Sequence, residues 1–221
     1  MAKRPRRKAP KATGHRTRVG QERRARMQAR IIEAALPVFA AAGEHAPVID
    51  DFIKAAGVAR GTFYNYYKST AELLEATRKW LDDDLIQSIE GEIGALTDPS
   101  ERLVLGVRLW LRKAAKDPDW CAFMVKAREV GKLVYESLSG DLRNGRRAGL
   151  FDYSSSDAAF DLVVGTVREA MNRLANGRVR RNFESDVARV ILQGLGMKRR
   201  AVEALLSRPV PTLRRPTRTI V

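Results

Sequence analysis

A short segment around residue 60 gathers side chains that can form hydrogen bonds with a partner. The spacing predicts a helix over residues 59–66 in which Phe63, with nearby Tyr67, anchors one face and leaves polar side chains on the other. These polar side chains are Arg60, Thr62, Asn65 and Tyr66. Gly61 has no side chain, so the backbone can approach a partner closely where amide groups and the positive helix end favour phosphate. These groups point to double-stranded DNA as the partner.

This polar helix is positioned by a second short helix and a tight turn. Apolar Phe52 lies on one face of a helix predicted over residues 48–56. Gly57 follows it, because glycine tolerates the positive φ that a tight turn between helices needs, and Val58 can fill the junction. The two helices and the turn therefore predict a helix-turn-helix.

In this region the chain resembles the TetR/AcrR family of bacterial regulators. The resemblance rests on Phe39, on the turn Ala55-Ala56-Gly57-Val58, and on the run Gly61-Thr62-Phe63-Tyr64-Asn65-Tyr66-Tyr67 followed by Leu73. It implies a three-helix DNA-binding domain whose helix over residues 59–66 enters the major groove. It also implies a repressor that is released from a near-palindromic operator by a small-molecule effector.

The resemblance assigns DNA contacts residue by residue. Contacts with base edges or their neighbours would come from Arg60, Thr62 and Asn65, and phosphate contacts from Tyr64, Tyr66 and Lys68. Gly61 would permit the close approach of the backbone. Thr70 stands where many family members have a lysine, and we include it in the expected DNA-binding set.

Most of the net charge lies at the two ends of the chain. The 221 residues carry a formal charge of +15, and residues 1–26 contain eleven Lys and Arg against Glu22 alone. Residues 208–221 add four Arg and no acid. Basic tails of this kind can bind DNA phosphates or serve only as solvated ends, and the sequence leaves both alternatives open.

The periodicity predicts an all-α fold in two parts, since apolar residues recur at helical spacing and no strict alternation is present. A first helix carrying Ile31, Ile32, Ala35, Leu36 and Phe39 can end at Gly43. Later helices are expected near residues 70–94, 99–115, 118–129, 131–147, 156–175 and 184–206. We divide the chain into a disordered basic tail (1–22), a helix-turn-helix domain (23–72), a helical effector-binding and dimerisation domain (73–207) and a Pro/Arg-rich tail (208–221).

The larger helical domain supplies two further sets of candidate residues. An apolar pocket with a few polar groups is expected from Trp110, Trp120, Cys121, Phe123, Met124 and Tyr135. The resemblance implies that the last two long helices pair with those of a second subunit, which gives the dimer residues Phe160, Val164, Val167, Met171, Val187, Ile191 and Leu195. Packing within one chain is the alternative for each of these residues.

Composition argues against several other classes of protein. One cysteine and two histidines cannot assemble a disulfide framework or a Cys/His metal site, and no nucleophile elbow or phosphate loop is present, so we expect neither an enzyme nor a cofactor. No run of about 18 apolar residues occurs, so we expect a cytoplasmic protein of a bacterium. The alternative function is an architectural protein that binds DNA through its tails with little sequence preference.

Overall fold

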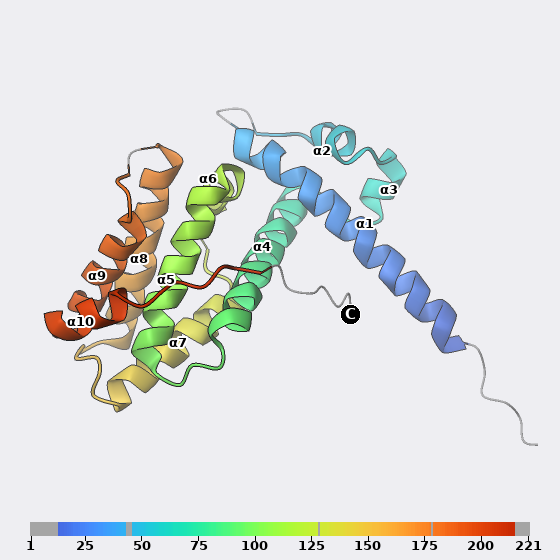
Figure 1. The fold of residues 1–221 in the computed structure, drawn as a ribbon. Coiled ribbons are helices and arrows are strands. Elements are labelled where there is room, and N and C mark those ends of the chain that lie inside the picture. Colours follow the sequence, from blue (N-terminus) through green and yellow to red (C-terminus); the bar gives the residue numbers. More distant parts are fainter. Residues whose placement is uncertain (1–12, 43–45, 128, 178, 215–221) are drawn as a thin grey trace, which may run out of the picture.

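The computed structural model describes residues 13–42, 46–127, 129–177 and 179–214, which form ten α-helices and no strand (Figure 1). The helices are α1 (Thr13–Ala41), α2 (Ile49–Ala56), α3 (Arg60–Tyr64), α4 (Thr70–Ile93), α5 (Pro99–Lys116), α6 (Pro118–Ala127), α7 (Lys132–Arg147), α8 (Ser156–Ala175), α9 (Phe183–Gly194) and α10 (Arg199–Leu206). The predicted all-α fold is confirmed. Helices α1 to α3 form a small unit, and α4 leads from it into the larger helical part.

The first helix begins earlier than the sequence led us to expect. Residues 13–22, assigned above to a disordered tail, belong to α1. Glu22 lies one turn from both Arg18 and Arg26, and its carboxylate is 3.6 Å and 3.7 Å from their guanidinium nitrogens. Such i,i+4 pairs and a run of good helix formers stabilise a helix without any buried face. The expected end of this helix at Gly43 lies outside the described residues.

The helix expected over residues 184–206 is instead two helices. Helix α9 ends at Gly194, and Gly196 has a φ of +87° before α10 begins at Arg199. The amide of Asp152 donates to the carbonyl of Leu195 at 2.8 Å, and a Cβ on Gly196 would lie 2.8 Å from the carbonyl oxygen of Asp152. The left-handed glycine and its contact with this segment end the helix, which the apolar periodicity alone did not reveal.

Two helix starts that the sequence predicted are confirmed. The amide of Glu72 donates to Ser69 Oγ at 3.1 Å, while the carboxylate of Glu72 accepts from the amide of Lys68 at 2.7 Å. Asp98 is the N-cap of α5: its carboxylate accepts from the amides of Ser100 and Glu101, and Pro99 is the first residue of the helix. These caps fix where α4 and α5 begin, which sets the register of the two helices that enclose much of the interior.

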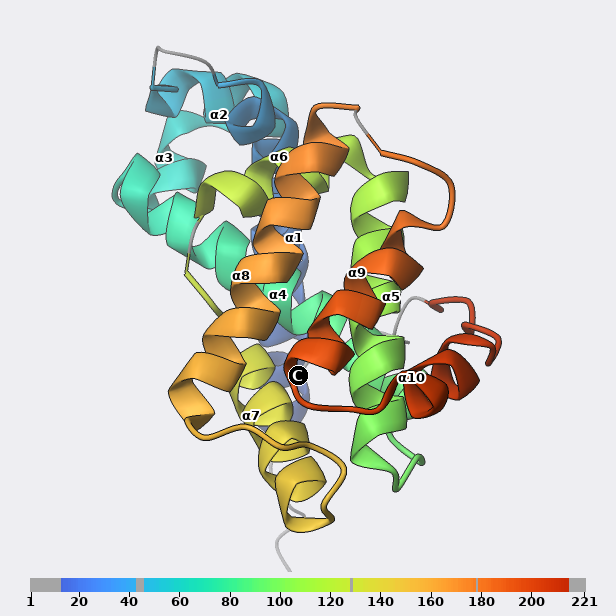
Figure 2. The same cartoon turned by 90° about the vertical axis from the view of Figure 1, so that its left-hand side faces the viewer.

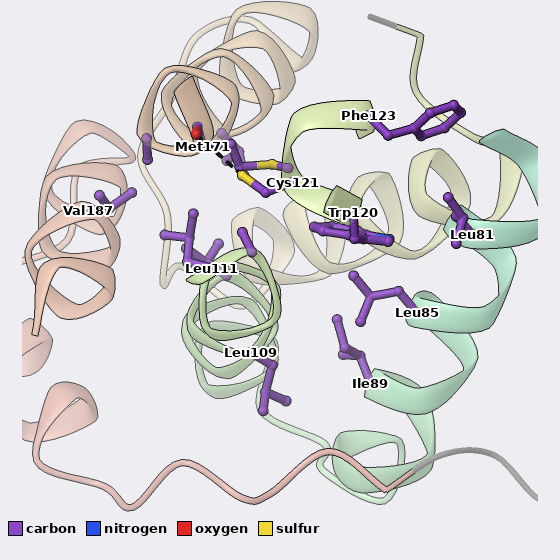
Figure 3. Close-up of a cluster of buried hydrophobic side chains, with 14 of the residues drawn as sticks. Leu81, Leu85, Ile89, Leu109, Leu111, Trp120, Cys121, Phe123, Met171 and Val187 are labelled. Atoms are coloured by element: carbon purple, nitrogen blue, oxygen red, sulfur yellow. Dashed lines mark hydrogen bonds between the residues drawn. The ribbon is translucent and has the colours of Figure 1, made fainter. Parts of the chain in front are cut away.

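A single hydrophobic core runs through both parts of the molecule. Ring centroids of Phe52 on α2 and Phe39 on α1 are 4.6 Å apart, and those of Phe39 and Phe123 on α6 are 5.7 Å apart. Beyond α6 the core continues between α4 and α5, where Trp120 lies beside Leu85 (Figure 3). The helix-turn-helix unit is thus packed directly on the larger helical part.

Within the described part of the chain, no helix is both long and apolar enough to cross a membrane.

Replacing Gly57 by alanine tests the predicted turn. We expect Gly57→Ala to lower the free energy of unfolding by about 1–2 kcal/mol, because residues with a Cβ are disfavoured in the left-handed region. Gly57 has a φ of +59°, and its added Cβ would lie 3.2 Å from Arg30 Nη2. Gly61→Ala is the matched control, since nothing lies within 4 Å of a Cβ built there. Urea unfolding followed by circular dichroism measures both variants, and equal stabilities would contradict the expectation.

Candidate DNA interface and internal cavity

The turn between α2 and α3 has the geometry that the sequence predicts. Gly57 adopts a φ of +59° as the C-cap of α2, and its amide donates to the carbonyl of Lys54. The amide of Val58 donates to the carbonyl of Ile53 at 3.3 Å, which completes the cap. Phe63 is fully buried beneath α3, so this short helix is held by one aromatic anchor while its other side stays open.

The expected DNA-binding residues lie together on and just after α3. Arg60, Gly61, Tyr64, Asn65 and Lys68 are exposed. Thr62, Tyr66 and Thr70 are half-buried.

Gly61 stands out in this set because no contact with the described residues requires a glycine there. No heavy atom lies within 4 Å of a Cβ built on it, and it is not among the described glycines with positive φ. Arg60 forms an exposed ion pair with Asp50 of α2. A pair this exposed contributes little to stability, so its guanidinium can exchange Asp50 for an external acceptor.

Helix α1 contributes a contact with this surface that sequence reasoning missed. The guanidinium of Arg24 lies over the ring of Tyr66, 5.6 Å from its centroid. Exposed Arg23, Arg26 and Arg30 lie on the same stretch of α1, and Figure 1 shows this helix extending past α3. The basic residues before residue 27 therefore belong in part to an ordered helical arm.

A cavity of about 150 Å³ lies inside the larger helical part. Its walls come from α4, α5, α6, α7, α8 and the segment between α6 and α7. Most of the lining side chains are aliphatic, among them Ile86, Ile89, Leu103, Val107 and Leu138. A mostly apolar hollow of this kind, which is partly open to solvent, suits an apolar molecule.

Two of the six predicted pocket residues line this cavity. These are Trp110 and Met124. Trp120 and Phe123 are each 1% exposed in the core and do not line it, while Tyr135 is exposed at the surface. The sequence pattern of apolar and aromatic residues does not distinguish side chains that line a cavity from side chains packed in the core next to it.

Cys121 is a buried core thiol, also outside the cavity wall. Its Sγ donates to the carbonyl of Met171 at 3.4 Å, a contact drawn in Figure 3. Burial raises the pKa of Cys121 to about 11, so the thiol stays protonated near neutral pH. No cluster of His, Cys, Asp and Glu that could hold a metal ion occurs in the described residues.

The cavity wall also holds charged residues that sequence reasoning missed. Arg102 of α5 donates from Nε to Asp141 at 2.7 Å and from Nη2 to Glu90 at 2.9 Å and 3.0 Å. The hydroxyl of Ser137 donates to the same Glu90 carboxylate at 2.7 Å. This network joins α4, α5 and α7, and the sequence pattern did not reveal it because its hydrogen-bonded partners are 12 to 47 positions apart.

Asp82 on α4 is the most deeply buried charge at the cavity. Its carboxylate is 3.0 Å from Arg78 Nη1, and it accepts from the backbone of Gly131 in the segment before α7. Burial raises the pKa of Asp82 to about 6, although Arg78 acts in the opposite direction. A Cβ on Gly131 would lie 2.7 Å from Asp82 Oδ2, so glycine permits this contact.

The predicted dimer residues lie mostly inside the subunit. Met171, Val187, Ile191 and Leu195 are at most 6% exposed and belong to the chain's own core. Val164 and Val167 line the cavity, and Phe160 packs against Tyr135 with ring centroids 5.0 Å apart. Helical periodicity identified the apolar side of α8 and α9, but that side faces the same chain.

The outer face of α8 and α9 carries a different set of residues. The two helices lie side by side on the face that Figure 2 turns to the viewer. A shallow groove between them is lined by Gly165, Thr166 and Val190, among others, and Val190 is 57% exposed. Gly194 lies so close to Leu162 that a Cβ there would meet Leu162 Cδ2 at 2.8 Å. Small and apolar residues therefore interrupt the polar surface of these helices.

Helix α6 contacts both the cavity and the helix-turn-helix unit. Met124 and Val125 line the cavity, while Phe123 packs on Phe39 of α1. Nζ of Lys126 donates to the backbone oxygens of Ala40 and Ala42, at the end of α1, at 2.9 Å and 2.7 Å. Four consecutive residues of one helix thus join the cavity wall to α1.

Comparison with known proteins agrees with this architecture. Residues 31–77 match the family of bacterial regulatory proteins, tetR family. RolR in complex with resorcinol superposes with a TM-score of 0.67 at 21% identity, covering 87% of this chain and 98% of that chain. FadR from Bacillus halodurans gives a TM-score of 0.67 at 24% identity over 77% of this chain and 97% of its own.

A second FadR, from Bacillus subtilis in complex with stearoyl-CoA, gives a TM-score of 0.61 at 22% identity, covering 75% of this chain and 96% of its own. A comparison with curated proteins found no matching sequence. The fold is that of helical transcriptional regulators with an N-terminal helix-turn-helix. The resemblance to the TetR/AcrR family is confirmed by the match over α2 and α3 and by the shared fold.

The buried Asp82 leads to a prediction on the pH dependence of stability. A carboxyl whose pKa is raised on folding, here from 3.8 to about 6, contributes stability at pH values below 3.8 that is lost as pH rises through 6. We expect the unfolding free energy of the native chain, relative to Asp82→Asn, to fall by on the order of 2 kcal/mol between pH 4 and 7. Urea unfolding at several pH values measures this difference. If the relative stability rises with pH instead, the attraction of Arg78 outweighs the effect of burial, and the pKa of Asp82 is lowered on folding.

Proposed function

We propose that this protein is a sequence-specific transcriptional repressor that binds a near-palindromic operator as a homodimer and releases it when a small apolar effector binds. It would act in the cytoplasm of a bacterium. The observation that carries the proposal is the group of exposed polar side chains on and just after α3, the second helix of the helix-turn-helix. Gly61 lies among them, with nothing within 4 Å of an added Cβ. A buried Phe63 holds α3 in place.

The proposed DNA contacts follow from exposure and chemistry. Arg60, Thr62 and Asn65 would read base edges, and Tyr64, Tyr66, Lys68 and Thr70 would contact the phosphate backbone. Gly61 would let the helix backbone approach, because a side chain at that position projects into open space where the DNA would lie. The exposed arginines of α1 would add phosphate contacts that depend on salt.

A homodimer is proposed because one short helix reads only a few base pairs. Two recognition helices roughly 34–36 Å apart would match two half-sites on one side of the duplex. The outer face of α8 and α9 is the proposed interface, since Gly165, with nothing within 4 Å of an added Cβ, permits close approach of a partner helix and Val190 is apolar and exposed. The proposed interface therefore consists of this outer face and not of the dimer residues expected from the sequence, most of which are buried within the subunit.

The proposed effector site is the internal cavity, and α6 is the proposed route from it to DNA. A ligand that moves Met124 or Val125 also moves Phe123 and Lys126, which contact α1. Release requires the ligand to favour a conformation in which the two recognition helices misfit the groove, because equal affinity for both states shifts nothing. RolR and FadR have been solved with resorcinol and stearoyl-CoA bound, which supports ligand binding in this fold.

An architectural DNA-binding protein is the alternative, favoured by the basic arm of α1. Its exposed arginines could bind phosphates without reading bases. This alternative predicts little discrimination between DNA sequences and a steep dependence of affinity on salt.

Selection of bound sequences from random duplex DNA tests the repressor proposal. With the full chain at near-physiological salt, we expect recovery of a near-palindromic site. Tyr64→Ala should weaken binding to that site by tenfold or more, because it removes the proposed phosphate contact of Tyr64, which is 43% exposed at the end of α3. Tyr135→Ala, which removes a tyrosine that is 53% exposed on α7, should leave affinity unchanged.

Recovery of unrelated sequences, with equal binding by both variants, would refute specific readout and favour the architectural alternative.

The dimer proposal predicts the effect of a charge on the α8–α9 face. Val190→Glu should convert the dimer to a monomer at micromolar concentration, because the buried carboxylate would have no partner across the interface. Leu74→Glu changes a leucine that is 40% exposed on α4 and serves as the matched control. Light scattering coupled to size-exclusion chromatography gives the mass of each. A Val190→Glu chain that stays dimeric would exclude this face.

A further inference from the structure

The volume of the internal cavity limits what it can hold. At about 150 Å³ it matches cavities that accept a single benzene ring, and it is smaller than the pockets that enclose drug-sized ligands. Its aliphatic walls suit a flat apolar ring. A long acyl chain would exceed this volume and could fit only by extending beyond the cavity.

Gly106, in the interior of α5, keeps part of this space open. A Cβ built on Gly106 meets only Ile93 Cδ1, at 3.9 Å, which is ordinary contact. Gly106 is also absent from the described residues with positive φ. Glycine is less favourable than alanine inside a helix, yet no packing or backbone constraint of the described residues requires it here. Because Gly106 and Ile93 both line the cavity, a methyl group at position 106 would project into it.

The polar part of the wall is rich in acceptors. Four carboxylates and two guanidinium groups line the cavity: Asp82, Glu90, Glu129, Asp141, Arg102 and Arg168. Arg102 is occupied, since it donates to Asp141, to Glu90 and, from Nη1, to the carbonyl of Ile93 at 3.2 Å. Ser137 donates its proton to Glu90, so its oxygen can still accept a hydrogen bond.

This wall disfavours an anionic ligand. Four carboxylates against two guanidinium groups leave an excess of negative charge in this wall, even though Glu129 is exposed, so a ligand carboxylate would meet net like charge there. A hydroxyl or amino group could instead donate to Ser137 Oγ or to one of the carboxylates.

We propose that the cavity binds an uncharged compound with one aromatic ring and a hydroxyl or amino group, and that Gly106 provides the room for the ring. The inference rests on the proposed function, because it takes the cavity as the effector site. It adds the chemical class of the effector and a residue that sets its size.

Calorimetric titration of the full chain, without DNA, tests the class. The probes are phenol, aniline, benzoate and octanoate. We expect phenol and aniline to bind, and benzoate and octanoate to bind at least tenfold more weakly. Equal binding of benzoate, or no binding of phenol and aniline, overturns the proposal.

A glycine pair tests the place of binding. Gly106→Ala should weaken phenol binding at least tenfold while leaving the melting temperature equal to or above that of the native chain, because alanine favours the helix. Gly140→Ala is the matched control, since Gly140 lies inside α7, has nothing within 4 Å of an added Cβ and does not line the cavity. Unchanged phenol affinity in Gly106→Ala would refute the cavity as the site.

Failure of this proposal can be told apart from failure of the proposed function. Operator selection without ligand measures the DNA-binding function alone. If the chain selects an operator but binds neither phenol nor aniline, the proposed effector class is refuted and the DNA-binding function stands. If the chain binds phenol but selects no DNA sequence, the proposed repressor function is refuted and the proposed ligand site stands.

Discussion

A chain of three phenylalanine rings forms the aromatic centre of the contact between the two parts of the molecule. Phe52 of the helix-turn-helix packs on Phe39 of α1, and Phe39 packs on Phe123 of α6. Each aromatic pair contributes about 0.5–1.5 kcal/mol beyond the burial of its area. The rings, together with the contacts of Lys126 and the packing of α1 on α4, hold the orientation of α2 and α3 relative to the larger helical part.

Charges inside the larger part are arranged around the same framework. Arg102 binds carboxylates of α4 and α7, so three helices around the cavity are tied by one guanidinium. Removing one partner of such a network leaves a buried charge without its counterpart, which is strongly unfavourable. Asp82 differs from these residues. Its pKa is raised because the attraction of Arg78 only partly offsets the cost of removing the carboxylate from water.

Local features were predictable from the sequence, and features that depend on long-range packing were not. The turn at Gly57 and the caps at Ser69 and Asp98 were found because a few neighbouring residues determine them. The break at Gly196 was missed, since its cause is a contact with Asp152 more than forty positions away. The wall of the cavity was largely missed for the same reason, because a helix with apolar residues on several sides does not reveal which side meets a void.

Helix α6 shows how such packing can connect two sites over a short distance. Consecutive residues of a helix point in different directions, so Phe123 and Lys126 can contact α1 while Met124 and Val125 line the cavity. A close-packed interior transmits displacement, because its side chains have few voids to move into. The cavity is one such void, and under the proposed function a ligand that fills it would change which positions of α6 are favoured. In the proposed function, the displacement caused by a bound ligand would pass to α1 through Phe123 and Lys126, which contact α1 and the residue after it from the other side of the helix.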